Sequence, residues 1–126
     1  MDVASVRYIV DDVAASVAFY RDHLGFTVEI DAAPGFAALA RGALRLLVNA
    51  TGGSGGASQP MPDGQLPTPG GWNRIQLTVA DLPAEVERLT AAGLTFRNAL
   101  VTGRGGAQIL LQDPAGNLVE LFQPAS

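Results

Sequence analysis

The chain has 126 residues, of which 48% are hydrophobic and 16% are charged, and its formal net charge at pH 7 is −4. This balance predicts a folded domain with a buried core, and it argues against a nucleic-acid-binding surface, which needs a basic face. The absence of cysteine excludes disulfides, thiolate metal ligands and a cysteine nucleophile. No apolar run approaches the length of a membrane span and no signal peptide is recognisable, so we expect a cytoplasmic protein with no membrane or nucleic-acid partner.

The first fifty residues predict a strand, a helix and three more strands. Apolar residues alternate with others from Val3 to Val10, which is the period of a strand. Asp12 can cap the helix that follows, and the helical spacing of apolar residues continues to Leu24, before Gly25 ends it. The three further strands are predicted at residues 26–30, 36–40 and 44–49.

Residues 51–71 differ in composition from the rest of the chain. They are rich in Gly, Pro and Ser and show no hydrophobic period, which predicts a linker or a long functional loop. Met61, Leu66 and several prolines leave open whether this segment packs as a lid.

The pattern of the first half then repeats. Val6 aligns with Ile75, Asp12 with Asp81 and Tyr20 with Leu89, all at one constant separation. The repeat predicts a helix over residues 82–92 and a tight turn at residues 113–117, where Pro, Gly and Asn favour a turn. Strands are predicted at residues 73–79, 95–98, 107–112 and 118–123. Each half is therefore expected to form an antiparallel-rich sheet backed by one helix.

The chain resembles the vicinal oxygen chelate superfamily, which includes glyoxalase, bleomycin-resistance proteins and extradiol dioxygenases. Three stretches carry this resemblance: VDDVAASVAFYRDHLGF, VADLPAEVERLTAAG and DPAGNLVELFQP. It implies an α+β fold in which tandem βαβββ modules form a curved mixed sheet around a cleft, and it implies a homodimer. The chain would be a single domain, built from module 1–50, loop 51–71 and module 72–126.

Enzymes of this superfamily hold a divalent metal with up to four side chains from the first and last strands of each module. Four positions of this chain match those of the metal-binding side chains, and two of them carry leucine and arginine. Leucine offers no donor atom and arginine cannot lose its proton to coordinate, so only one of the four positions carries a usual metal ligand. The only histidine, His23, falls in the first predicted helix. The four matching positions are Ser5, Leu46, Arg74 and Glu120. We therefore expect no metal cofactor, and instead an Arg74–Glu120 pair where the metal would lie.

Strand alternation predicts a cleft face with an apolar wall and a few polar groups, which suits a small organic ligand. The function expected is a metal-free binding protein for such a ligand, in the manner of bleomycin-resistance proteins, with arginines that favour an anionic or carbonyl-bearing compound. Arg74 could instead only stabilise the fold, and Trp72 could only cover the core. The ligand-binding candidates are Trp72, Arg74, Gln76, Gln108, Arg7, Phe36 and Leu46.

The alternative is an enzyme of the same superfamily, such as a glyoxalase-type lyase, a dioxygenase or an epimerase. One form would hold a metal through Glu120 with Gln76 or Gln108. A metal-free form would use Glu120 as general base and Arg74 to stabilise a developing oxyanion. We rank the enzyme second, because a carboxylate that already accepts the hydrogen bonds of an arginine is a poor proton acceptor.

Overall fold

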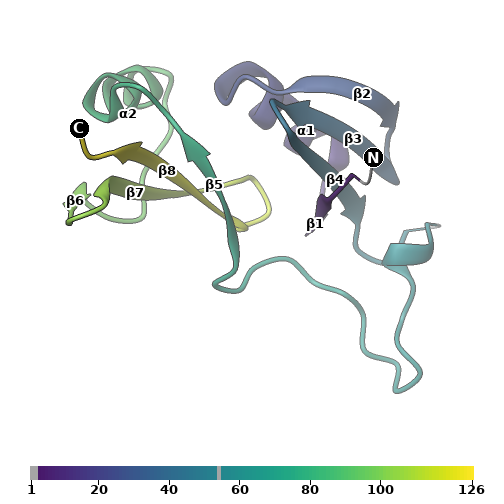
Figure 1. The fold of residues 1–126 in the computed structure, drawn as a ribbon. Helices are drawn as coiled ribbons and strands as arrows, with labels where there is room; N and C mark the ends of the chain where they lie inside the picture. The colour runs from purple at the N-terminus through teal and green to yellow at the C-terminus, as the bar shows by residue number, and fades with distance from the viewer. Residues whose placement is uncertain (1–2, 54) are drawn as a thin grey trace. The chain divides into compact units, whose positions relative to one another are not determined.

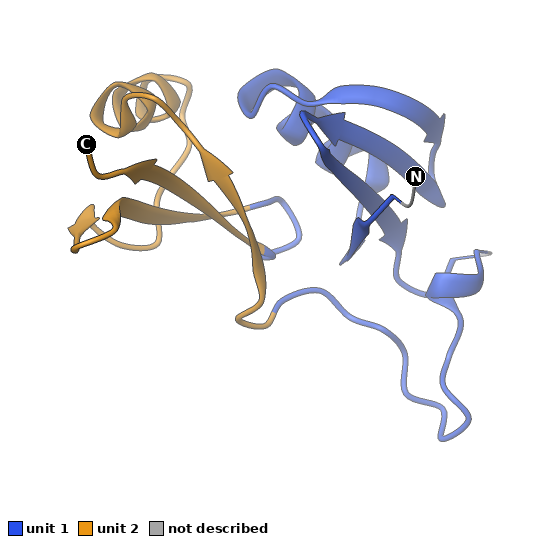
Figure 2. Ribbon diagram, in the orientation of Figure 1, with its two compact units in different colours: residues 1–70, 113–117 blue, residues 71–112, 118–126 orange. Residues whose placement is uncertain are grey.

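The computed structural model describes residues 3–53 and 55–126, which fall into two compact units. Unit 1 comprises residues 1–70 together with the turn at 113–117, and unit 2 comprises residues 71–112 and 118–126 (Figure 2). Figure 1 labels the helices and strands of each unit. None of the described helices is long and apolar enough to cross a membrane.

The described residues of unit 1 form one α-helix and a four-stranded mixed sheet. The strand order is β1-β4-β3-β2, in which β1 and β4 run parallel and the other neighbours run antiparallel. Asp12 caps the helix as predicted, because its side chain accepts a hydrogen bond from the backbone N–H of Ala15. The elements are β1 (Ser5–Val10), α1 (Val13–His23), β2 (Thr27–Ala32), β3 (Phe36–Arg41) and β4 (Leu44–Ala50).

Unit 2 repeats this arrangement. Its strand order is β5-β8-β7-β6, with β5 and β8 parallel, and Asp81 caps its helix through the N–H of Ala84. The two-fold βαβββ order predicted from the sequence is therefore confirmed. The elements are β5 (Arg74–Thr78), α2 (Leu82–Ala91), β6 (Val101–Thr102), β7 (Gly106–Gln112) and β8 (Leu118–Pro124).

The strand predicted at residues 95–98 is wrong. Only Phe96 pairs there, in an isolated bridge with Leu111, and the strand β6 begins further along at Val101. The side chain of Asn98 accepts the hydrogen bond of the Leu110 N–H that a backbone carbonyl would accept in a continuous ladder. Asparagine side chains compete with the backbone in this way, which ends regular pairing.

Each sheet has one face that packs against its helix and one open face without a helix of its own unit. In unit 1 the packed face carries Val10, Leu46 and Val48, which are fully buried with Val17 and Tyr20 of α1. Leu77, Leu111, Val119 and Leu121 occupy the equivalent face of unit 2 beside Leu82 and Leu89 of α2. Side chains alternate between the faces of a strand, so the residues between these positions lie on the open face.

The turn at residues 113–117, which the sequence predicted, is held within unit 1 by a buried network. The carboxylate of Asp113 accepts hydrogen bonds from the hydroxyl of Tyr20 at 2.8 Å, from the N–H groups of Ala115 and Asn117 at 2.9 Å, and from the Asn117 amide at 3.1 Å. The same amide donates to the carbonyl of Ile9 at 2.8 Å. Burial, and next the Asp113 carboxylate, raise the pKa of Tyr20 far above its usual value, so its hydroxyl stays a donor.

The segment predicted as a linker or loop contains no strand in its described part. One short 3-10 turn, η1 (Gly56–Ser58), interrupts it, and the Thr51 hydroxyl donates to the carbonyl of Pro67 at 2.6 Å. Met61 and Leu66 remain about half exposed in unit 1. A lid function of this segment stays a prediction.

Candidate functional site

Three polar side chains of unit 2 meet on the open face of its sheet. Arg74 and Gln76 are two residues apart on β5, so they point to the same side of the strand. Glu120 lies on the neighbouring strand β8, directly opposite Gln76 in the parallel register. The sequence predicted this convergence, and the register confirms that the three residues share one face.

The carboxylate of Glu120 is occupied by two partners. Its Oε1 accepts a hydrogen bond from Nε of Arg74 at 3.0 Å and forms an ion pair with Nη2 of Arg74 at 3.0 Å, and its Oε2 accepts from the side-chain amide of Gln76 at 2.6 Å. The Glu120 side chain is only 7% exposed, against 30% for Arg74. A carboxylate removed from water needs such charge-assisted hydrogen bonds to offset its desolvation.

Apolar side chains surround this cluster on the same face. The register pairs Arg74 with Leu118, Glu120 with Leu110, and Phe122 with Gln108. Leu118 is buried, while Leu110, Phe122 and Gln108 are partly exposed. The face therefore combines an apolar wall with a few directional polar groups, the composition typical of small-molecule sites.

A tryptophan and an arginine stack at this sheet. The Cζ atom of Arg97 lies 4.6 Å from the centre of the Trp72 ring, within the range of a cation–π contact. Phe96 bridges to the buried Leu111 of the packed face, so alternation directs Arg97 to the open face, beside Leu110. Trp72 is 66% exposed, which leaves much of its ring available.

Arg97 was not among the predicted site residues. It lies within residues 95–98, where the predicted strand is reduced to one isolated bridge, and its partner Trp72 lies 25 positions earlier in the chain. The one signal in the sequence was Trp72 itself, which follows two glycines and was predicted as a ligand contact, because aromatic rings stack well on flat groups.

The predicted residues Arg7 and Phe36 belong to unit 1. Arg7 donates to the Oδ1 atom of the buried Asn49 at 2.8 Å, and Phe36 lies opposite Asn49 on β3, partly buried. Both lie on the open face of their own sheet. Asn49 was not predicted as a site residue, because in the sequence it stands only at the end of a predicted strand.

The placement of Leu46 in the site is wrong. Leu46 pairs with Val6 and Leu39 and is fully buried on the face that packs against α1. Its neighbour Leu47 pairs with Arg7, as Glu120 pairs with Gln76, and is the structural counterpart of Glu120. Leu46 lies four residues after the turn glycine Gly42, as Glu120 lies four residues after Gly116. This equal spacing misleads because β4 begins one residue earlier, relative to its parallel partner, than β8 does.

The residues present do not fit a divalent metal. With the corrected register, the four family positions are Ser5, Leu47, Arg74 and Glu120, and the one carboxylate among them is already hydrogen-bonded to an arginine and ion-paired with it. A guanidinium cannot coordinate a cation and repels it. Within residues 3–53 and 55–126, no group of three or more His, Cys, Asp or Glu side chains is arranged to hold a metal ion.

Comparison with known proteins places the chain in a family. Residues 3–121 match the family model described as Glyoxalase/Bleomycin resistance protein/Dioxygenase superfamily. The chain belongs to this superfamily. The resemblance inferred from the three sequence stretches is thereby confirmed. No curated protein has a significantly similar sequence.

Solved structures of the superfamily share the fold. A lactoylglutathione lyase from Agrobacterium tumefaciens is 20% identical with a TM-score of 0.75, and the match covers 97% of this chain and 92% of that one. TnmS3, an antibiotic binding protein from Streptomyces sp. CB03234, is 22% identical with a TM-score of 0.74, and the match covers 99% and 97%. A superfamily member from Sphaerobacter thermophilus DSM 20745 is 25% identical with a TM-score of 0.74, and the match covers 98% and 97%.

Proposed function

We propose that this member of the superfamily binds a small organic molecule without a metal ion, using the open face of the unit 2 sheet. The observation that supports this most is the Glu120 carboxylate, which Arg74 and Gln76 hold at 2.6 to 3.0 Å. A ligand-binding role for the face requires no further cation, because Arg74 already neutralises the buried carboxylate.

The side chains around this pair indicate the class of ligand. The exposed ring of Trp72 offers a stacking surface, and the guanidinium of Arg97 lies against that ring. Guanidinium groups bind carboxylate and carbonyl oxygens, and aromatic rings bind flat, apolar groups. We therefore expect a planar compound that carries a carbonyl or anionic group, and antibiotics of this chemistry are natural candidates because TnmS3 is an antibiotic binding protein.

An enzymatic function receives less support. The lactoylglutathione lyase shares only 20% of its residues with this chain, which shows the fold alone. A metal route lacks ligands, and a metal-free route would need Glu120 to take up a proton while three donor atoms already point at its two oxygens.

The test is a ligand screen followed by site variants. Trp72 is the only tryptophan in the chain, so its fluorescence reports on the face directly when planar antibiotics and aromatic carboxylates are titrated. For a responding compound, calorimetry should show that Trp72→Leu and Arg97→Gln each weaken binding by about tenfold, or about 1.4 kcal/mol.

Arg104→Gln is the matched control, because Arg104 is exposed in the turn before β7 and the substitution removes the same charge. It should leave the affinity unchanged. A panel without any responding compound, or a responder that binds the Trp72 and Arg97 variants as tightly as the original protein, would contradict the proposal.

A further inference from the structure

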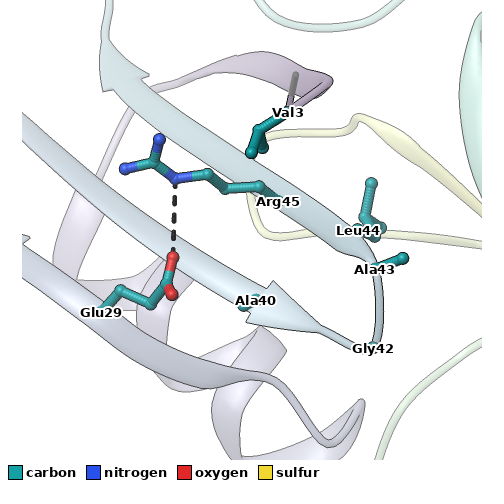
Figure 3. Close-up of a pocket in the computed structure, with 7 residues that line it drawn as sticks. All are labelled: Val3, Glu29, Ala40, Gly42, Ala43, Leu44 and Arg45. Atoms are coloured by element: carbon teal, nitrogen blue, oxygen red, sulfur yellow. Dashed lines mark ion pairs between the residues drawn. The ribbon is translucent and has the colours of Figure 1, made fainter. Parts of the chain in front are cut away.

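A pocket of about 430 Å³ lies in unit 1, and none of the residues that line it belongs to the proposed site. It sits at the end of the sheet where the β3–β4 hairpin turns (Figure 3). Its volume falls in the range of small-molecule sites. The lining residues are Val3, Glu29, Ala40, Gly42, Ala43, Leu44 and Arg45.

The strand register explains why a pocket forms there. Ala40 of β3 lies directly opposite Arg45 of β4 on the open face, and its methyl group fills little of the space above the sheet. On the other side, the pairing of β2 with β3 shifts between Val28 and Ile30, so Glu29 is the extra residue of a β-bulge. A bulge redirects a side chain from its regular position, and here Glu29 reaches over the small Ala40 toward Arg45.

The two charged groups of the pocket are imperfectly paired. Nε of Arg45 lies 3.5 Å from Oε1 of Glu29, beyond the usual length of an N–H···O hydrogen bond. This Nε is buried and has no hydrogen-bond partner among the described residues. Figure 3 shows the two side chains approaching each other across the pocket, with Val3 on the far side of the arginine.

Such a pair is easily opened by a ligand. The side chains of Arg45 and Glu29 are 40% and 47% exposed, and exposed ion pairs contribute little to stability. A buried donor without an acceptor is by contrast costly. A ligand group that accepts from Arg45 and donates to Glu29 would restore the missing hydrogen bond, and only a rotation of the exposed Glu29 side chain is needed to admit it.

We propose that this pocket binds a small uncharged molecule through a carboxamide group, with a short aliphatic part against Val3 and Leu44. A carboxamide presents an acceptor and a donor side by side, which matches an arginine next to a carboxylate. A free carboxylate would meet Glu29 and the net negative charge of the chain, and an ammonium group would meet Arg45.

Three probes with the same carbon skeleton separate these cases: isobutyramide, isobutyrate and isobutylamine. In a titration followed by ¹H–¹⁵N NMR, isobutyramide should shift the Arg45 Nε–H signal and the backbone amides of Ala40 and Gly42. A Kd on the order of 10 mM is expected for a ligand of this size. The acid and the amine should bind at least about tenfold more weakly.

Variants make the test specific. Arg45→Gln should abolish the shifts at Ala40 and Gly42, whereas Glu29→Gln should remove the discrimination against isobutyrate, because the repelling charge is gone. Arg21→Gln removes an exposed ion-paired arginine of α1 in the same unit and should change nothing.

The proposal is overturned if isobutyramide causes no shift at these positions, if isobutyrate or isobutylamine binds as well as the amide, or if the amide binds Arg45→Gln unchanged. The dispersion of the NMR spectrum shows in each case whether the variant is folded. Since Trp72 and Arg97 are not involved, this outcome is independent of the ligand screen on unit 2.

Discussion

Replacing Asp113 by alanine should lower the free energy of unfolding by about 3–5 kcal/mol, the largest effect expected for a single substitution in this chain. The carboxylate accepts four hydrogen bonds and is 4% exposed. Its removal leaves the hydroxyl of the fully buried Tyr20 without an acceptor and releases two backbone N–H groups of the 113–117 turn. Buried donors left unsatisfied bear the whole cost of their desolvation.

Urea denaturation measures this effect, with Asp63→Ala as the control. Asp63 accepts a hydrogen bond from the N–H of Gln65, two residues further on, as Asp113 does from the N–H of Ala115. Unlike Asp113, Asp63 lies in an exposed turn. Its loss should cost less than about 1 kcal/mol. Tyr20→Phe, which removes only one bond to the carboxylate, should fall between the two at about 1.5–3 kcal/mol. If Asp113→Ala lowers the free energy of unfolding by less than Tyr20→Phe does, the Asp113 carboxylate is not the centre of the network.

The second large effect concerns the Arg74–Glu120 pair. Arg74→Met and Glu120→Leu should each destabilise the protein by about 2–4 kcal/mol, because each leaves one member of an ion pair with a buried carboxylate without its partner. The double variant should be much less destabilised than the sum of the two, with a coupling free energy of about 2 kcal/mol or more. Apolar residues of similar volume often replace a buried ion pair at little cost.

The ion pair of Arg88 with Glu85 on α2 provides the comparison. Its side chains are 50% and 33% exposed and 2.6 Å apart, so distance alone would predict an equally strong interaction. Exposed pairs on a helix contribute about 0.5 kcal/mol or less, and the Glu85→Ala/Arg88→Ala cycle should give that value. Equal coupling in the two cycles would mean that Glu120 is as well solvated as Glu85.

Much of the fold was predictable because it depends on local sequence patterns that occur in both halves of the chain. Asp12 and Asp81 each precede a helical pattern, and each caps its helix. Alternation along β5 and β8 was enough to bring Arg74 and Gln76 to the face of Glu120, because parallel neighbours in register share a face.

The errors arise where pairing between strands decides the outcome. Leu46 and Leu47 differ by one position, and one position moves a side chain to the opposite face, so only the observed pairing with Val6 identifies the buried one. Local alternation over residues 95–98 suggested a strand. The side chain of Asn98, however, accepts the hydrogen bond of the Leu110 N–H in place of a backbone carbonyl, and regular pairing ends there.

Contacts between distant segments were likewise beyond the sequence. The stacking of Arg97 on Trp72 depends on how a segment without regular structure passes beside β7. The meeting of Glu29 with Arg45 depends on a β-bulge, which the pattern of β2 does not reveal.

The most direct test of the central proposal, that an arginine occupies a position where the family resemblance implies a metal ligand, is the binding of divalent ions by the purified protein. Metal content after mild purification, followed by calorimetric titration with Zn²⁺, Mn²⁺, Fe²⁺ and Ni²⁺, measures it. From the Arg74–Glu120 pair we expect far less than one bound ion per chain after purification. In the titration we expect no saturable metal binding that depends on Glu120, so Glu120→Gln should not change the result. One tightly bound ion per chain that is lost in Glu120→Gln would contradict the account and make the metal-dependent enzyme the better proposal.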